Sequence, residues 1–179
     1  TLIKRVMDAG ADGIIVPMIE TKDDAFQTIN SLNYPPFGKR GMGLSRAQEY
    51  GNKFEEYLKW MKNGPSIILQ IESIKGVENL EDILSFNEIS GIFIGPYDLS
   101  ASLGLPGQFE SPKYLDAINK IKKICSNKKV KLGIHVVKPN INELKIKINE
   151  GYYYIAYSVD TIMLDKFNFF VWTNFFYLI

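Results

Sequence analysis

Short apolar runs alternate with amphipathic stretches along most of the chain. Five runs have the length and composition of strands: 13–17, 66–71, 91–95, 131–136 and 152–156. The stretches with helical spacing are 21–32, 54–61, 77–86, 112–126 and 141–149. Strands that alternate with helices predict parallel pairing with right-handed crossovers. The pattern therefore predicts an α/β fold, in which the apolar runs are buried strands.

Two consecutive strands end abruptly in polar groups. The first leads through Gln70 into Glu72, and the second leads through Gly-Pro into Asp98 and Ser100. Ligands of parallel α/β folds bind at the carboxyl ends of the strands. Neighbouring strand ends would bring the carboxylates of Glu72 and Asp98 to one ion. Two solvated acids at loop starts are the plainer alternative, and the Gln-x-Glu and Gly-Pro-x-Asp-Leu-Ser contexts favour the shared ion.

Length and charge narrow the class of protein. The 179 residues suffice for a single domain over residues 1–179, with no linker inside it. With 21 Lys and Arg against 20 Asp and Glu, the net charge of +1 suggests neither nucleic acid nor an acidic membrane surface as a partner. No run approaches the roughly 20 apolar residues of a membrane helix. A single cysteine, Cys125, fits a reducing compartment, so we expect a cytoplasmic protein.

Both ends of the chain are unusual. The segment that starts at Thr1 lacks an initiator methionine and a signal-peptide layout, and it has the pattern of the middle of a helix. We therefore expect a fragment of a longer protein. The tail at 165–179 is crowded with aromatic residues. Such a tail is typical of a segment that covers a core or a partner subunit.

Several motifs together resemble a known family. They include Tyr34-Pro-Pro-Phe-Gly-Lys-Arg-Gly-Met-Gly43, Gln70-Ile-Glu72 and Phe93-Ile-Gly-Pro-Tyr-Asp-Leu-Ser100, with further matches at 9–21 and 103–108. These segments, in this order, resemble the HpcH/HpaI aldolases, which are class II metal-dependent pyruvate aldolases related to the citrate lyase β-subunit. The resemblance covers about residues 2–165.

The resemblance implies a partial (β/α)₈ TIM barrel. The five runs would be about strands 4 to 8, with their helices, and the first three strands, roughly 70 residues, would be absent. The catalytic histidine of the family and its pyruvate-binding arginine belong to those three strands. The only histidine here, His135, is not expected to replace that base, because the family base comes from the second strand.

The resemblance also assigns roles to five residues. Glu72 and Asp98 would bind a divalent metal, Mg²⁺, Mn²⁺ or Co²⁺. Gln70, together with the backbone N–H groups of Tyr97 and Asp98, would bind the substrate. Asp8 would support the absent histidine base. Considered without the family, Gln70 is equally well a satisfied polar residue of the barrel interior, and Asp8 is a solvated helix residue.

The function implied is that of a carbon–carbon lyase. The full-length parent would cleave a 4-hydroxy-2-oxo acid to pyruvate and an aldehyde through a metal-stabilised enolate, as a homo-oligomer, which is a hexamer in the family. The fragment alone is expected to be inactive. The alternatives are an acyl-CoA or citrate-type lyase of the same superfamily and a non-catalytic fragment that needs another chain to complete the barrel. A Schiff-base aldolase is disfavoured, because no strand carries a lysine near its carboxyl end.

Overall fold

The computed structural model describes residues 2–166, which form two compact units. The first unit ends at Leu132 and the second begins at Gly133. Most of the aromatic tail, residues 167–179, lies outside the described residues. The assignment of residues 1–179 to a single domain stays a prediction.

Three parallel strands form the centre of the first unit. They are β1 (Gly13–Val16), β2 (Ser66–Ile71) and β3 (Ile89–Ile94), with β2 between the other two. Around them lie α1 (Leu2–Asp8), α2 (Lys22–Leu32), the 3₁₀ helix η1 (Arg46–Gly51), α3 (Phe54–Asn63), α4 (Ile74–Glu78), α5 (Leu80–Ile83), α6 (Pro96–Ser102) and α7 (Pro112–Lys128). The register pairs Ile71 with Ile94, so β2 and β3 end side by side, and it pairs Val16 with Leu69, so β1 ends two residues earlier.

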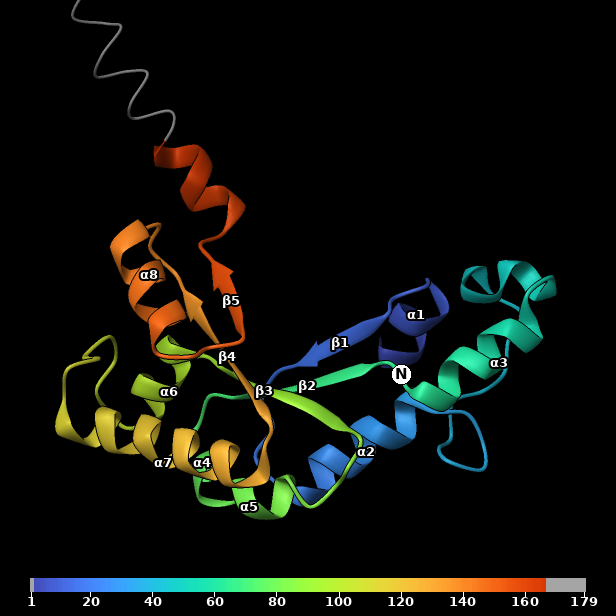
Figure 1. Cartoon of the computed structure of the whole chain (residues 1–179), viewed down its shortest axis with the longest axis horizontal. Coiled ribbons are helices and arrows are strands. Elements are labelled where there is room, and N and C mark those ends of the chain that lie inside the picture. Colours follow the sequence, from blue (N-terminus) through green and yellow to red (C-terminus); the bar gives the residue numbers. More distant parts are fainter. Residues whose placement is uncertain (1, 167–179) are drawn as a thin grey trace, which may run out of the picture. The chain divides into compact units, whose positions relative to one another are not determined.

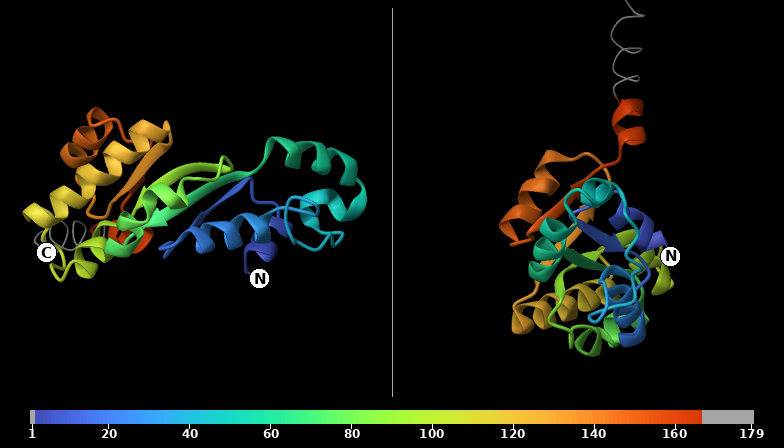
Figure 2. Two further views of the ribbon diagram at one scale, coloured as in Figure 1. Left: turned by 90° about the horizontal axis from the view of Figure 1, so that it is seen from below. Right: turned by 90° about the vertical axis from the view of Figure 1, so that its right-hand side faces the viewer.

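Helices α2, α4, α5 and α7 cover one face of these strands, as both views show (Figures 1 and 2). Each helix buries one apolar stripe, which is how an amphipathic helix stabilises a sheet. In α7 the buried residues recur every three or four positions: Tyr114, Ala117, Ile118, Ile121, Ile124 and Cys125. Burial raises the pKa of the Cys125 thiol to about 12, so it stays protonated at neutral pH.

Three other helices of this unit, α1, η1 and α3, lie at the amino-terminal ends of the strands, whereas α6 directly follows the carboxyl end of β3. Figure 1 shows α1, η1 and α3 beyond the amino-terminal ends of β1 and β2. Arg46 at the start of η1 donates to the carbonyl oxygen of Ala9 at 3.1 Å, which joins η1 to the end of α1. Gly10 closes α1 with φ of 98°, in the left-handed region expected of a helix-ending glycine.

The second unit is a smaller parallel pair. It holds β4 (Lys131–Val136), whose first two residues belong to the first unit, α8 (Ile141–Asn149) and β5 (Tyr154–Tyr157). Gly133 pairs with Tyr154, and Val136 pairs with Tyr157. Residues 160–166 are helical. His135 lies in β4, with its Nε2 atom 3.1 Å from the carbonyl oxygen of Ser158.

Most of the predicted elements are confirmed to within one or two residues at each end, and several other details are wrong. The predicted helix 77–86 is two short helices, α4 and α5, because the backbone of Asn79 leaves the helical geometry between them. Residues 96–102, to which the sequence analysis assigned no element, form helix α6, which has only 7 residues and so shows little helical periodicity. The strand β1 is only partly buried, since half of the Ile15 side chain is exposed.

The amino-terminal end of α2 is stabilised by a capping box. Thr21 accepts a hydrogen bond from the N–H of Asp24, and the Asp24 side chain accepts one from the N–H of Thr21, which together form a capping box. We predict that Thr21→Ala lowers the free energy of unfolding by about 1 kcal/mol in urea titrations. Ser85→Ala, at an exposed site, is the control. Equal midpoints for both variants would contradict the role of the cap.

Candidate active site at the carboxyl ends of the strands

Backbone hydrogen bonds hold the three strand ends of the first unit together. The N–H of Ile19, beyond β1, donates to the carbonyl of Gln70 at 3.3 Å. The N–H of Gly95, beyond β3, donates to the carbonyl of Ile71 at the same distance. The residues that directly follow β2 therefore lie between the chain segments that leave β1 and β3. This is where the sequence predicted a ligand site.

Glu72 is the buried carboxylate of this region, with 5% of its surface exposed. Its Oε1 atom accepts a hydrogen bond from the backbone N–H of Met18 at 2.8 Å, and its Oε2 atom accepts one from the side-chain amide of Gln70. Met18 has φ of 58°, a left-handed conformation that is uncommon for a residue with a side chain. Such backbone strain recurs at functional sites.

The backbone of Gly95, directly after β3, lies against the same carboxylate. A Cβ atom at this position would lie 2.6 Å from Oε2 of Glu72 and 3.0 Å from Nε2 of Gln70, closer than real contacts allow. Only a glycine therefore lets the Gln70 and Glu72 side chains lie against the backbone that leaves β3. From the sequence, Gly95 is only part of the Gly-Pro-x-Asp-Leu-Ser motif, and this close approach was not predicted.

Asp98 and Tyr97 follow three and two residues after Gly95, in the first turn of α6. Both are exposed, and 42% of the Tyr97 surface is open to solvent. The Tyr97 ring packs edge-on against Phe109, with 5.0 Å between the ring centroids. The first N–H groups of a helix have no acceptor within the helix, so those of Tyr97 and Asp98 are free to bind a ligand.

Two serines fix α6 in place. The hydroxyl of Ser100 donates to the carbonyl of Tyr97 at 2.7 Å and accepts from the N–H of Gly107 at 2.9 Å. The hydroxyl of Ser102 accepts from the N–H of Ile74 at 2.9 Å, which joins α6 to α4. Their hydrogen bonds to backbone groups explain why the Asp-Leu-Ser-Ala-Ser segment is rich in serine, and this role was not predicted.

The residues present fit a divalent cation. A buried carboxylate needs a compensating charge, yet no ion pair between described residues involves Glu72. The nearest lysine in sequence, Lys75, pairs instead with Glu20 at 3.0 Å. The Lys75 hydrogen bond lowers the pKa of Glu20. Carboxylate oxygens are ligands that hard divalent ions prefer. Residues 2–166 contain no group of three or more His, Cys, Asp or Glu side chains placed to hold one metal ion together.

Asp8 lies elsewhere. It ends α1, before β1 begins, whereas Glu72 follows the other end of the neighbouring strand. The two residues are therefore separated by about one strand length, on the order of 15 Å. Within the first unit, the structure therefore does not bring Asp8 to the carboxyl end of β2, where Gln70 and Glu72 lie.

The surroundings of Asp8 also differ from those of a solvated helix residue. Its carboxylate pairs with Lys4 and lies 3.5 Å from Nη1 of Arg40. The Arg40 side chain is completely buried and lies over the Tyr34 ring, 4.1 Å from its centroid. Its Nη2 atom donates to the Tyr57 hydroxyl at 2.9 Å. Burial of Arg40 could not be foreseen, because it lies in a glycine-rich loop that is typical of a surface.

Parallel strands with polar groups at their carboxyl ends are the arrangement of α/β barrel proteins. Comparison with known families agrees with this class. The family model for HpcH/HpaI aldolase/citrate lyase matches residues 1–165. The chain belongs to this family, as its motifs predicted.

Similar proteins support the assignment. The 2-keto-3-deoxy-L-rhamnonate aldolase of Escherichia coli O17:K52:H18 (strain UMN026) is 36% identical over 166 residues, which are 91% of this chain and 61% of that protein. The crystal structure of an HpcH/HpaI aldolase/citrate lyase family protein from Burkholderia cenocepacia J2315 has a TM-score of 0.88 at 30% identity, over 96% of this chain and 68% of the other. That of the HpcH/HpaI aldolase from Desulfitobacterium hafniense DCB-2 has a TM-score of 0.81 at 25% identity, over 93% and 64%.

These likenesses confirm the predicted partial (β/α)₈ barrel. The chain spans about 61% of the length of the curated relatives it matches. No helix within residues 2–166 is long and apolar enough to cross a membrane.

The close approach at Gly95 gives a sharp test of the site. We predict that Gly95→Ala lowers the free energy of unfolding by about 1–3 kcal/mol, because the new methyl group must displace Glu72 and Gln70. Gly41→Ala is the matched control, since its Cβ would meet only the Lys4 side chain at 3.8 Å. The measurement is urea unfolding of both variants. A Gly95→Ala protein as stable as Gly41→Ala would show that Glu72 does not lie against this backbone.

Proposed function

We propose that this chain supplies the metal-binding and substrate-binding half of a class II pyruvate aldolase. The observation that carries the proposal is the buried Glu72 carboxylate, which lacks a cationic partner among the described residues and lies beside the turn that leads to Asp98. The complete reaction would be cleavage of a 4-hydroxy-2-oxo acid to pyruvate and an aldehyde.

Glu72 and Asp98 would hold the divalent ion, Mg²⁺, Mn²⁺ or Co²⁺. When bound, the ion would supply Lewis-acid stabilisation of the negative charge that develops on a keto oxygen. The protein keeps Glu72 ready for this role: the Met18 N–H and the Gln70 amide orient its two oxygens. Because these donors are neutral, they fix the direction of the carboxylate and leave its charge for the ion.

Gln70 and the start of α6 would bind the substrate. The Nε2 atom of Gln70 donates to Glu72, and an amide nitrogen has a second hydrogen to offer a ligand. The N–H groups of Tyr97 and Asp98 would receive the carboxylate of a 2-oxo acid, which a helix start favours through its partial positive charge. Ser100 holds this turn by its bond to the Tyr97 carbonyl.

Asp8 keeps its role only as a prediction from the family. The histidine that it would support has no counterpart in residues 1–179, and His135 lies in a separate unit, against the Ser158 carbonyl. The homo-oligomer and the cytoplasmic location also remain predictions, the first from the family and the second from the single cysteine.

Metal binding can be tested without turnover. We predict that Glu72→Gln and Asp98→Asn each weaken Mn²⁺ binding at least about tenfold in calorimetric titrations, because each removes a charged oxygen ligand while preserving side-chain shape. The matched controls are Asp116→Asn, which neutralises an exposed acid on α7, and Met18→Ala, which keeps the backbone donor to Glu72.

Ser73→Ala is a poor control, although Ser73 adjoins Glu72. The Ser73 hydroxyl accepts a hydrogen bond from the N–H of Gly76 and caps α4, so its loss would destabilise the helix. Equal Mn²⁺ affinity in Asp98→Asn and Asp116→Asn would place the ion elsewhere and contradict the proposal.

Catalysis gives a separate test. We predict that residues 1–179 alone release no measurable pyruvate from a 4-hydroxy-2-oxo acid with Mn²⁺, because the histidine base and the arginine of the family are each worth about 100-fold or more in rate. Fusion to the first three βα units of the Escherichia coli relative should restore pyruvate release, and Glu72→Gln should abolish it in the fusion. Metal-dependent release by the chain alone would overturn this prediction and make His135 a candidate base.

A further inference from the structure

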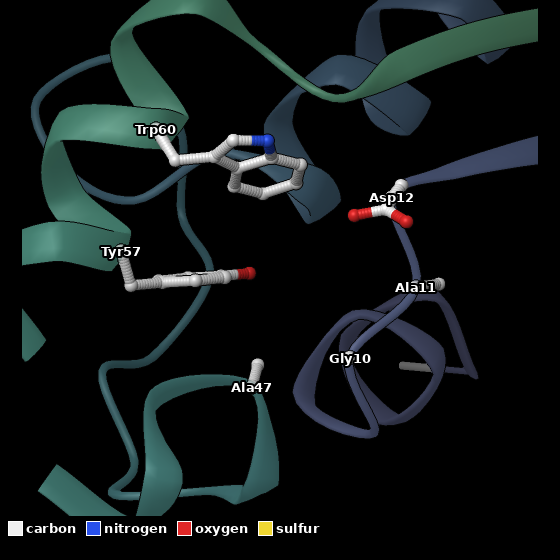
Figure 3. Close-up of a pocket in the computed structure, with 6 residues that line it drawn as sticks. All are labelled: Gly10, Ala11, Asp12, Ala47, Tyr57 and Trp60. Atoms are coloured by element: carbon white, nitrogen blue, oxygen red, sulfur yellow. The ribbon is translucent and has the colours of Figure 1, made fainter. Parts of the chain in front are cut away.

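A pocket lies at the amino-terminal end of β1, away from Glu72. It has a volume of about 200 Å³ and is lined by Gly10, Ala11, Asp12, Ala47, Tyr57 and Trp60. Figure 3 shows the aromatic rings of α3 on one side and the loop that joins α1 to β1 on the other. Nothing proposed above for the active site uses these residues, so an inference drawn from them does not depend on the proposed function.

Small residues keep the pocket open. A Cβ atom at Gly10 would approach only the Cα atom of Ala47, at 3.9 Å, so the two segments nearly touch at the pocket floor. Larger residues at position 10, 11 or 47 would occupy the space. The pocket thus depends on a local run of small side chains, Ala9-Gly-Ala11, together with Ala47.

The aromatic wall is rigid. Tyr57 is 9% exposed, and its hydroxyl accepts a hydrogen bond from the completely buried Arg40 at 2.9 Å. Its ring contacts Tyr34 at 6.1 Å and Trp60 at 5.3 Å between centroids. On the other side, the Asp12 carbonyl accepts from the N–H of Ser66 at 3.0 Å, which fixes the loop to the start of β2. A wall held in this way loses little entropy when a ligand binds.

Three polar groups at the pocket have hydrogen-bonding capacity to spare. Among residues 2–166 the Asp12 carboxylate and the Trp60 indole N–H have no hydrogen-bond partner, and the Tyr57 hydroxyl, which accepts from Arg40, still has its proton to donate. Figure 3 shows the nitrogen edge of Trp60 turned to the side of Asp12, and the Tyr57 hydroxyl turned towards the same loop. The pocket therefore offers two donors, a charged acceptor and an indole ring.

We propose that this pocket binds a small neutral polyhydroxylated ring, of the size of one monosaccharide. Hydroxyl groups both donate and accept, so one ligand can donate to Asp12 and accept from Trp60 and Tyr57. Its apolar C–H face can pack on the indole ring, which combines an apolar surface with a polar edge. A volume of about 200 Å³ has room for one such ring and not for a chain of them.

Other classes of small ligand satisfy the pocket less well. An organic ammonium would pair with the exposed Asp12 carboxylate but would offer no acceptor to the half-buried indole N–H or to the Tyr57 hydroxyl, so it would form one of the three possible hydrogen bonds. An anion would accept from both donors but would be repelled by the Asp12 carboxylate. Only a ligand with both donors and acceptors can form hydrogen bonds with the Asp12 carboxylate, the Trp60 indole N–H and the Tyr57 hydroxyl together.

The test is a set of calorimetric titrations of residues 1–179 with D-glucose, D-galactose, D-xylose, choline and acetate. We expect saturable binding of at least one sugar with a dissociation constant on the order of 1 mM, as suits about 10–12 non-hydrogen atoms. Choline and acetate should not compete with it. Binding should weaken at least about tenfold in Asp12→Asn, which preserves shape, and in Ala47→Leu, which fills the pocket.

Tyr50→Ala is the matched control, because Tyr50 is an exposed aromatic residue of η1 that does not line the pocket. It should bind the sugar as the unchanged chain does. Urea unfolding of each variant shows whether it is folded, and Asp12→Asn keeps the test decisive if Ala47→Leu is not. The proposal is overturned if no sugar binds at about 50 mM, far above the affinity expected for its size. It is also overturned if choline or acetate binds in place of the sugars, or if sugar binding survives both substitutions.

Discussion

The contact between the Glu72 carboxylate and the bare backbone of Gly95 is the constraint on which the candidate active site depends. A methyl group there would lie 2.6 Å from Oε2, so β2 and β3 can present the carboxylate beside α6 only because residue 95 has no side chain. The N–H of Met18, held at φ of 58°, fixes the other oxygen. The buried negative charge of Glu72 is thus placed by the strand register, by Met18 and by Gly95, at a position where a cation can compensate it.

The sequence predicted the features that follow from periodicity and from local chemistry. Apolar runs located the strands, helical spacing over residues 21–32 located α2, and Gln70 with Glu72 marked a polar strand end. These signals are local, because a few consecutive residues are enough to identify a strand or a helix. The barrel itself was foreseen from family motifs, since five strands alone do not define how a sheet closes.

Features that depend on packing between distant segments could not be predicted. Arg40 lies in a glycine-rich loop, yet its guanidinium is buried between Asp8 of α1, Tyr34 of the same loop and Tyr57 of α3. The separation of Asp8 from Glu72 follows from where α1 and β2 end, not from residue type. The pocket beside Trp60 could not be predicted from the sequence either, because Gly10, Ala11 and Asp12 lie 45 to 50 residues before Tyr57 and Trp60 and meet them only in the fold.

The central claim is that Glu72 and Asp98 share one divalent ion. Crystals of the protein soaked with Mn²⁺ and measured at a wavelength with strong manganese anomalous scattering test this directly. The expected result is one dominant anomalous peak about 2.1 Å from a carboxylate oxygen of Glu72 and at a similar distance from one of Asp98. A dominant peak that contacts neither carboxylate, or Glu72 bound to a protein cation in its place, would contradict the claim.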